Sequence, residues 1–179
     1  MRRPTDLRDR LRHSTREDHA QVDCLLSTLN LASAQDYVRF LAIHAEALSE
    51  LGNRTSLSDR ADTAALMACL ETDLEFYGAR ATRAVAAHTH DSPGRQIGIS
   101  YVIRGSRLGA EVLVRRIAVG APSAYLSYRP TTTWGNFVQS LEVFSLTHPP
   151  ENEHEVVAGA KAAFGVFLLA AQPAGPTTC

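Results

Sequence analysis

The chain has almost no lysine. Among its 179 residues are 18 basic side chains, of which only Lys161 is a lysine, and 19 acidic side chains, for a net charge of −1. A protein that binds nucleic acid by itself is normally strongly basic, so this balance argues against that class of function. Any site for an anion must be built from arginine, backbone N–H groups or neutral donors.

Cysteine and long apolar runs are also scarce. The three cysteines, Cys24, Cys69 and Cys179, are an odd number at wide spacings, with no CxxC pair. This pattern argues against a disulfide framework and fits a reducing cytosol. The first residues lack the apolar segment of a signal peptide, and the longest apolar run, 164–171, is far shorter than the ~20 residues of a membrane span. We therefore expect a cytoplasmic protein with no membrane partner.

The composition that is present predicts an ordinary globular domain. Hydrophobic residues make up 45% of the chain and charged residues 21%. A chain of this length buries roughly 70% of the surface of its unfolded form, so it needs no disulfide or metal to fold. We expect a single domain over 1–179, with its core at about 10–171 and a frayed tail at 172–179.

The spacing of apolar residues predicts helices almost throughout the chain. The clearest stripe runs over 37–51, where apolar side chains recur three, four or seven residues apart. Ser33, with Asp36 three residues later, resembles a capping box at the start of this helix. Strand-type alternation is scarce, so the expected fold is all-α. The helices are expected over about 4–29, 33–51, 60–90, 95–119, 122–128, 132–147 and 151–171.

The helix expected over 95–119 is unusually rich in glycine. It contains Gly98, Gly105 and Gly109, and each interior glycine costs ~1 kcal/mol relative to alanine. One interpretation is close packing against another helix. The other is that a flat or bulky ligand lies on the backbone, because Gly105 and Gly109, one turn apart, clear one face and permit a kink. The Ser106 hydroxyl would then be available to ordered water.

Two histidines lie on or beside apolar faces. His19 is at the flank of the apolar stripe of the first expected helix. It is either a surface or core histidine with no special role, or a ligand of a metal or of haem iron. His44 lies between Phe40 and Leu48 on the apolar face of its helix, and we interpret it as packed in the core.

Arg12 and Arg16 are four residues apart on the first expected helix, ahead of His19. Acidic neighbours at Asp9 and Glu17 favour the interpretation that the two arginines belong to a charged, solvent-exposed face of this helix. The alternative is a pair of guanidinium groups that binds carboxylates at the mouth of a cleft.

Together these segments resemble the haem oxygenase family, particularly the bacterial branch that supplies biliverdin to bacteriophytochromes. The segment 11–19, LRHSTREDH, is similar to the family's L-(K/R)-x-x-T-(K/R)-x-x-H, whose last residue is the proximal haem ligand. The segment 101–113 resembles the glycine-rich distal helix. An aromatic helix around Trp134 and Phe137 and then the segment 160–164 follow in the family's order, so the resemblance covers about 10–171.

The resemblance implies a single-domain all-α bundle of the haem oxygenase type, with haem between the first helix and a kinked distal helix. It implies O₂- and reductant-dependent cleavage of haem to biliverdin, CO and iron, with haem as both substrate and cofactor. Electrons would come from a ferredoxin, a flavodoxin-type protein or a reductase, and a bacteriophytochrome would receive the biliverdin. The residues implied are His19 as the axial ligand of the haem iron, Gly105, Ser106 and Gly109 in catalysis, and Arg12, Arg16, Tyr101, Gly105, Gly109 and Ala110 in haem binding.

The sequence departs from the family pattern in its distal helix. Ser106 stands where many members have an aspartate that anchors a water, although serine resembles the bacteriophytochrome-associated branch. Ala110 replaces the second glycine of the usual pair and is expected to add a methyl group near the haem. Arg104 stands where bacterial relatives often have an acidic residue. These changes support haem binding better than turnover, so a non-catalytic haem or tetrapyrrole binding or sensing protein stays open as the alternative.

The later helix also departs from the pattern. The segment 134–140 has no lysine or arginine to hold the haem propionates. This role is therefore expected to fall to Arg12 and Arg16, with Tyr101 or Arg129 as possible neighbours. A further rival shares the fold without haem, as in thiamin-degrading relatives, which need an activated cysteine and a carboxylate in the cleft.

Overall fold

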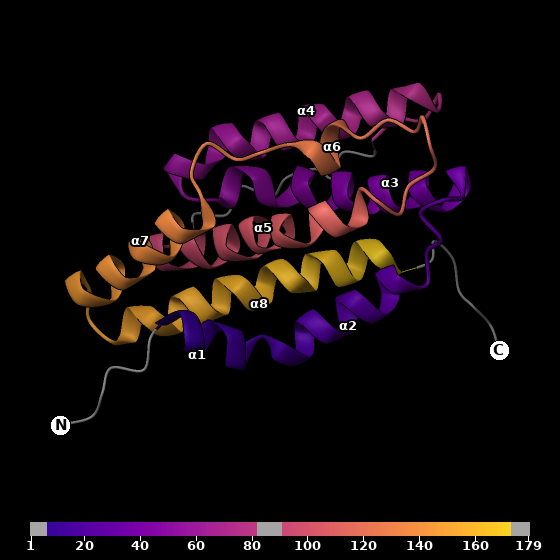
Figure 1. The fold of residues 1–179 in the computed structure, drawn as a ribbon. Coiled ribbons are helices and arrows are strands. Elements are labelled where there is room, and N and C mark those ends of the chain that lie inside the picture. The colour runs from indigo at the N-terminus through magenta and orange to yellow at the C-terminus, as the bar shows by residue number, and fades with distance from the viewer. Residues whose placement is uncertain (1–6, 82–90, 173–179) are drawn as a thin grey trace.

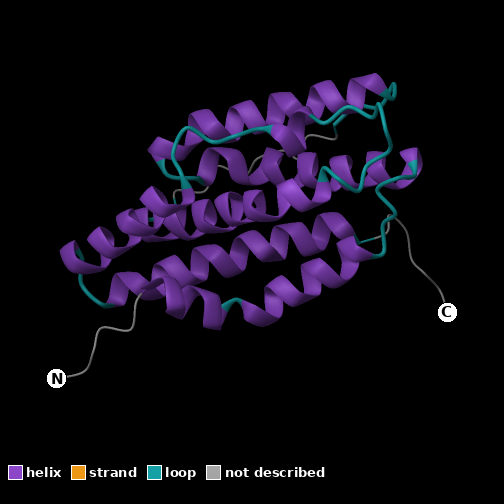
Figure 2. Cartoon of the chain, in the orientation of Figure 1, coloured by secondary structure: helices purple, strands orange, loops and turns teal. Residues whose placement is uncertain are grey.

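The computed structural model describes residues 7–81 and 91–172, and all regular structure in these ranges is helical. Figure 2 shows helices joined by loops, with no strand in the described part of the chain. The predicted all-α fold is therefore confirmed. The elements are α1 (Leu7–Ser14), α2 (Arg16–Ser27), α3 (Ala34–Leu51), the 3₁₀ turns η1 (Gly52–Arg54) and η2 (Leu57–Asp59), α4 (Arg60–Phe76), α5 (Pro93–Leu113), α6 (Ala124–Ser127), α7 (Trp134–Thr147) and α8 (Glu151–Ala171).

The helices are stacked around a central pair, α5 and α8, which lie side by side along much of their length (Figure 1). On one side of this pair α3 packs against α8 and α4 packs against α3. On the other side α1 and α2 pack against α8. The short α6 packs against both α4 and α5, and α7 contacts α1 and α5. This arrangement brings α2, α3, α5 and α8 around one interior space.

Glycines explain how closely α5 and α8 approach. A Cβ atom added to Gly98 on α5 would collide with the backbone carbonyl of Val156 on α8. A Cβ atom added to Gly159 on α8 would collide with the backbone of Arg95 on α5. Close helix packing, one of the two interpretations of the glycine-rich helix, therefore holds for Gly98.

Replacing Gly98 with alanine is expected to lower the free energy of unfolding by about 1–3 kcal/mol, because the added methyl group overpacks a backbone contact that cannot move by itself. Denaturant unfolding of the purified protein measures this. Gly109→Ala is the matched control on the same helix, since no atom lies within 4 Å of a Cβ added there. It should stabilise the helix slightly through alanine's higher propensity. Equal stability changes in both variants would contradict this account.

Several predicted helix boundaries are wrong. The single helix expected over 4–29 is two helices, α1 and α2, which meet at Thr15. The buried Thr15 hydroxyl donates to the carbonyl of Leu11 at 2.8 Å, a bond within the helix of the kind that bends helices. Residues 4–6 of that prediction lie outside the described residues.

Two later helices end earlier than the sequence predicts. The helix expected over 60–90 ends at Phe76, because Gly78 has φ +68° and closes the helix end; residues 82–90 of the prediction lie outside the described residues. The glycine-rich helix ends at Leu113 and not at 119, and a stretch of turn follows before Gly120, which has φ +82° seven residues after Leu113. α5 is assigned as one continuous helix, so the predicted kink stays a prediction.

α8 is the one helix in the described part of the chain that is long and apolar enough to cross a membrane by length and composition. Its longest uninterrupted apolar run is nevertheless short, as the sequence indicates. Contacts with α5, α3, α2 and α1 surround it. A helix covered from several sides in a bundle is apolar for that reason, so we interpret α8 as the core helix of this fold.

Candidate functional site

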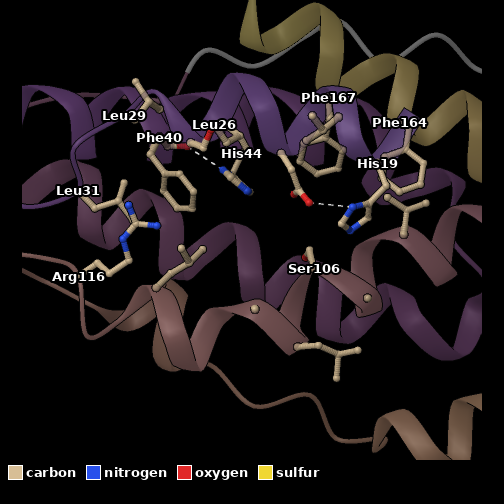
Figure 3. A pocket seen from close by; sticks show the side chains of 18 of the residues that line it. His19, Leu26, Leu29, Leu31, Phe40, His44, Ser106, Arg116, Phe164 and Phe167 are labelled. Atoms are coloured by element: carbon tan, nitrogen blue, oxygen red, sulfur yellow. Dashed lines mark hydrogen bonds and ion pairs between the residues drawn. The ribbon is translucent and has the colours of Figure 1, made fainter. Parts of the chain in front are cut away.

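A cavity of about 550 Å³ opens between α2, α3, α5 and α8. Its volume is in the usual range for small-molecule and cofactor sites. Figure 3 shows the walls, which are mainly apolar, with Leu26 and Leu29 on one side and Phe164 and Phe167 on another. The polar or charged side chains that line it are His19, Asp23, Ser27, His44, Tyr101, Ser106 and Arg116.

His19 projects from α2 into this pocket, and its orientation is determined by two neighbours. Its Nδ1 lies 2.9 Å from Oδ2 of Asp23, one turn later on α2 (Figure 3). Its ring makes an edge contact with Phe164 of α8, with centroids 5.6 Å apart. Because a carboxylate can only accept, Nδ1 carries the proton, and in the neutral ring Nε2 keeps a free lone pair. The side chain is 61% exposed, so this lone pair is accessible to a ligand in the open cleft.

Two glycines of α5 face the same space. Gly105 and Gly109 both line the pocket. A Cβ added at Gly109 would meet no atom within 4 Å, and one added at Gly105 would only touch the Trp134 ring at 3.9 Å. Neither glycine is therefore needed for helix packing, in contrast to Gly98. The second interpretation of the glycine-rich helix, a face cleared for a ligand, fits these two positions.

The other predicted residues of the distal helix divide between pocket and core. Ser106 lines the pocket, and its hydroxyl donates to the carbonyl of Ile103 at 2.7 Å. Ala110 is buried in the helical core and is not among the residues that line the pocket. The expectation that its methyl group lies near a ligand is therefore not supported by its placement.

Arg104 also faces away from the pocket. Its guanidinium is buried and forms ion pairs with Asp59 and Asp62, and it donates to the carbonyl of Thr132 at 2.8 Å. Burial raises the pKa of Asp62, but hydrogen bonds from Thr131 and Tyr128 and the charge of Arg104 outweigh burial and hold that pKa below its usual value. Arg104 thus ties α5 to the loop before α7 and leaves the pocket unaffected.

The predicted anion-binding arginines lie outside the pocket. Arg12 and Arg16 are exposed, and neither lines the cavity. Arg129 is exposed and pairs with Glu111 at 3.2 Å. Tyr101 does line the pocket; burial raises the pKa of its phenol, and the charges of Arg8 and Arg12 oppose that rise. Arg12 is therefore close enough to act electrostatically at the Tyr101 end of the cleft.

The structure adds pocket residues that the sequence interpretation missed. Arg116 lines the pocket at the end away from His19 (Figure 3). The sequence interpretation missed it because it extended the helix to 119, whereas α5 ends at Leu113 and Arg116 lies in the turn that follows. Asp23 could have been found, because it lies four residues after His19 on one helix face. His44 is buried as expected, but it also lines the cavity.

The cysteines contribute nothing to this site in the described part of the chain. Cys24 is exposed and does not line the pocket. Cys69 is partly buried and also lies outside the pocket, and burial raises the pKa of its thiol. A raised pKa makes a thiol a poor nucleophile. The thiamin-degrading alternative therefore loses support, while Cys179 lies outside the described residues.

Comparison with known proteins gives one kind of match. The sequence matches no protein-family model and no curated protein. The fold matches a solved structure of the NO- and CO-bound haem oxygenase from Neisseria meningitidis, with a TM-score of 0.74 and 21% sequence identity over 93% of this chain and 90% of that chain. This chain therefore has the haem oxygenase fold.

Proposed function

We propose that this protein is a haem oxygenase, which uses O₂ and an external reductant to cleave haem to biliverdin, CO and iron. One observation carries the proposal. His19, with a free Nε2, and the side-chain-free face of α5 at Gly105 and Gly109 line the same 550 Å³ pocket. An imidazole ligand on one element and bare backbone on another are what a flat, iron-containing ligand requires.

The residues present fit haem by their chemistry. The walls are predominantly aliphatic and aromatic, which suits a tetrapyrrole face. The Nδ1–H of His19 is held by Asp23, which is the usual support of a metal-binding histidine because it fixes the tautomer and raises the basicity of the other nitrogen. At Gly105 and Gly109 a Cβ atom would fit without collision, so the absence of side chains there leaves open space beside the α5 backbone for a ligand.

When bound, haem supplies both the iron that reacts with O₂ and the ring carbon that is oxidised. The protein's own part is positioning. His19 holds the substrate from α2, and Phe164 restricts rotation of the His19 ring. Gly105 and Gly109 let the substrate lie against the α5 backbone, and the apolar walls exclude bulk water from one side of it.

The positions of the arginine side chains indicate which residues would bind the haem propionates. Arg116 is the arginine that lines the pocket in the described part of the chain. Tyr101, near Arg12, and Leu113, just before Arg116, are twelve residues apart on α5, about 18 Å at 1.5 Å per residue. The cleft therefore offers two carboxylate-binding ends. We propose that Arg116 binds a propionate, with Tyr101 and Arg12 as the alternative end.

Arg116→Ala is expected to weaken hemin affinity by about 10-fold or to change the biliverdin isomer, since losing a charge-assisted hydrogen bond in such an open site costs about 1.5 kcal/mol, the low end of its usual range. Hemin titration and chromatography of the product measure the two effects. Arg16→Ala and Arg12→Ala are the controls. A larger effect from either of these than from Arg116→Ala would place the propionates at the Tyr101 end, as the sequence predicts.

The proposed activity has a direct test. The purified protein is titrated with hemin, and a reductant is then added under air. We expect a Soret band that saturates at one hemin per chain and then gives way to biliverdin absorption. A stable Soret band after reduction would support the haem-binding or sensing alternative, which the engagement of the Ser106 hydroxyl with Ile103 favours. Absence of any Soret band would overturn both.

The finer parts of the proposal concern the cellular setting. A haem oxygenase needs an electron donor, and a ferredoxin, a flavodoxin-type protein or a reductase would serve. Delivery of biliverdin to a bacteriophytochrome would account for the serine at Ser106, which resembles that branch of the family. Both steps fit a cytoplasmic location, and reconstitution with each donor tests which one supports turnover.

A further inference from the structure

A second histidine, His44, lies in the wall of the pocket and has no role in the function proposed above. It comes from α3, is 5% exposed and lines the cavity, where Figure 3 shows it between Phe40 and the His19 side of the pocket. Three aromatic rings surround it, with centroid distances of 4.2 Å to Phe40, 5.3 Å to Tyr125 and 5.5 Å to Phe167. This packing holds the imidazole in one orientation.

The tautomer of His44 follows from its backbone contact. Its Nδ1 lies 2.8 Å from the carbonyl oxygen of Phe40, which can only accept, so Nδ1 carries the proton. Burial lowers the pKa of His44 to about 4; the charge of Arg107 acts in the same direction and the Phe40 bond opposes it. The ring is therefore neutral at pH 7, and Nε2 is a hydrogen-bond acceptor.

This acceptor has no partner within residues 7–81 and 91–172: the hydrogen bond of the His44 ring found there is the one from Nδ1. Nε2 is not sealed inside the protein, since the buried side-chain atoms without a partner do not include it, and His44 lines the cavity. A donor from the pocket, an ordered water or a ligand group, can therefore reach it.

The other polar groups of the pocket differ from His44 in their exposure or in the bonds that they make. The hydroxyls of Ser106 and Ser27 donate to the carbonyls of Ile103 and Cys24, at 2.7 and 2.8 Å. Asp23 is held by His19. Arg116 can only donate. Among the polar side chains that line the described pocket, His44 is the buried one, Tyr101 is partly buried, and the others are exposed.

We propose that His44 is a positioning residue, whose Nε2 accepts a hydrogen bond from an ordered water inside the pocket and so orients that water towards the bound substrate. A water that donates one O–H to Nε2 keeps its second O–H for the substrate side. His44 would thereby supply, from α3, an acceptor that is buried and held in one orientation, whereas Ser106 on α5 is exposed. The proposal rests on the proposed haem oxygenase function.

The test compares His44→Leu, which removes the acceptor at similar volume, with His44→Gln, whose side-chain oxygen restores an acceptor. His148→Leu is the matched control. Like His44, His148 has its Nδ1 close to the carbonyl oxygen of the residue four positions earlier, 3.1 Å from that of Phe144, and its ring stacks on the Phe144 ring. Unlike His44, it does not line the pocket. Each variant is loaded with hemin, reduced and exposed to CO, and the C–O stretching band is recorded. Turnover under O₂ is measured in parallel, and ¹⁵N NMR of the apo-protein reports the tautomer.

We expect hemin affinity to stay within about threefold in all variants, since His44 is not the iron ligand. In His44→Leu the C–O band should shift and turnover should fall by about 10-fold, the loss that one hydrogen bond of typical strength predicts. His44→Gln should restore both, and His148→Leu should match the wild type. ¹⁵N NMR should show protonated Nδ1 and bare Nε2 at pH 7.

The two proposals fail in different ways. If the wild type binds and cleaves haem but His44→Leu has an unchanged C–O band and turnover, the role of His44 is overturned and the proposed function stands. A protonated Nε2 at pH 7 in the apo-protein also overturns the role of His44 alone. If hemin does not bind, both proposals fail.

Discussion

Turnover of haem is expected to fall by about 100-fold or more in the His19→Ala variant, because the loss of a metal ligand should cost at least as much as the 10- to 100-fold effect of losing its supporting hydrogen bond. The Soret band should shift, since the iron loses its imidazole ligand. Adding free imidazole should restore part of the wild-type spectrum, because the alanine leaves open space in a pocket that is already accessible. Absorption spectroscopy and the biliverdin assay measure these effects.

The controls for this variant separate ligation from general damage. His13 lies on α1, six residues earlier, is exposed and does not line the pocket, so His13→Ala should keep the wild-type spectrum and activity. Asp23→Asn keeps His19 but weakens the hold on its Nδ1–H. It should give an intermediate loss, of about 10-fold. An unchanged spectrum and affinity in His19→Ala would remove His19 from the site.

A side chain placed at Gly109 is expected to block the pocket without unfolding the protein. No atom lies within 4 Å of a Cβ added there, and the residue lines the cavity. Leucine also has a higher helix propensity than glycine by somewhat under 1 kcal/mol. The apo form of Gly109→Leu should therefore be at least as stable as the wild type, while hemin affinity falls by about 10-fold or more, because the leucine occupies the space of the ligand.

Thermal unfolding of the apo-protein and hemin titration measure the two sides of this prediction. Gly165 on α8 is the control for helix propensity, since a Cβ added there also meets no atom within 4 Å and the residue does not line the pocket. Gly165→Ala should raise stability without changing hemin affinity. Normal hemin affinity in Gly109→Leu would mean that the ligand does not lie against this face of α5.

Local sequence patterns were sufficient for much of the fold. The apolar spacing around Phe40 and Leu48 predicts α3, and the helix expected over 151–171 matches the bounds of α8, because periodicity is a signal that acts within a few residues. The helix boundaries that were predicted wrongly depend on a side-chain hydrogen bond or on a backbone dihedral angle. Thr15 bends its helix through a bond to the Leu11 carbonyl, and Gly78 ends α4 because it adopts a positive φ. Composition does not reveal which threonine or glycine does this.

By itself, the sequence determined the helical character of the chain, the apolar faces of the helices and the order in which His19, the glycine-rich helix and the aromatic helix occur. Only the tertiary structure decided what each face meets. It placed Gly98 against α8 but Gly105 and Gly109 against a cavity, buried Arg104 with aspartates, and brought Arg116 to the pocket. The physical reason is that periodicity records which side of a helix avoids water. It does not record whether another helix or a ligand covers that side.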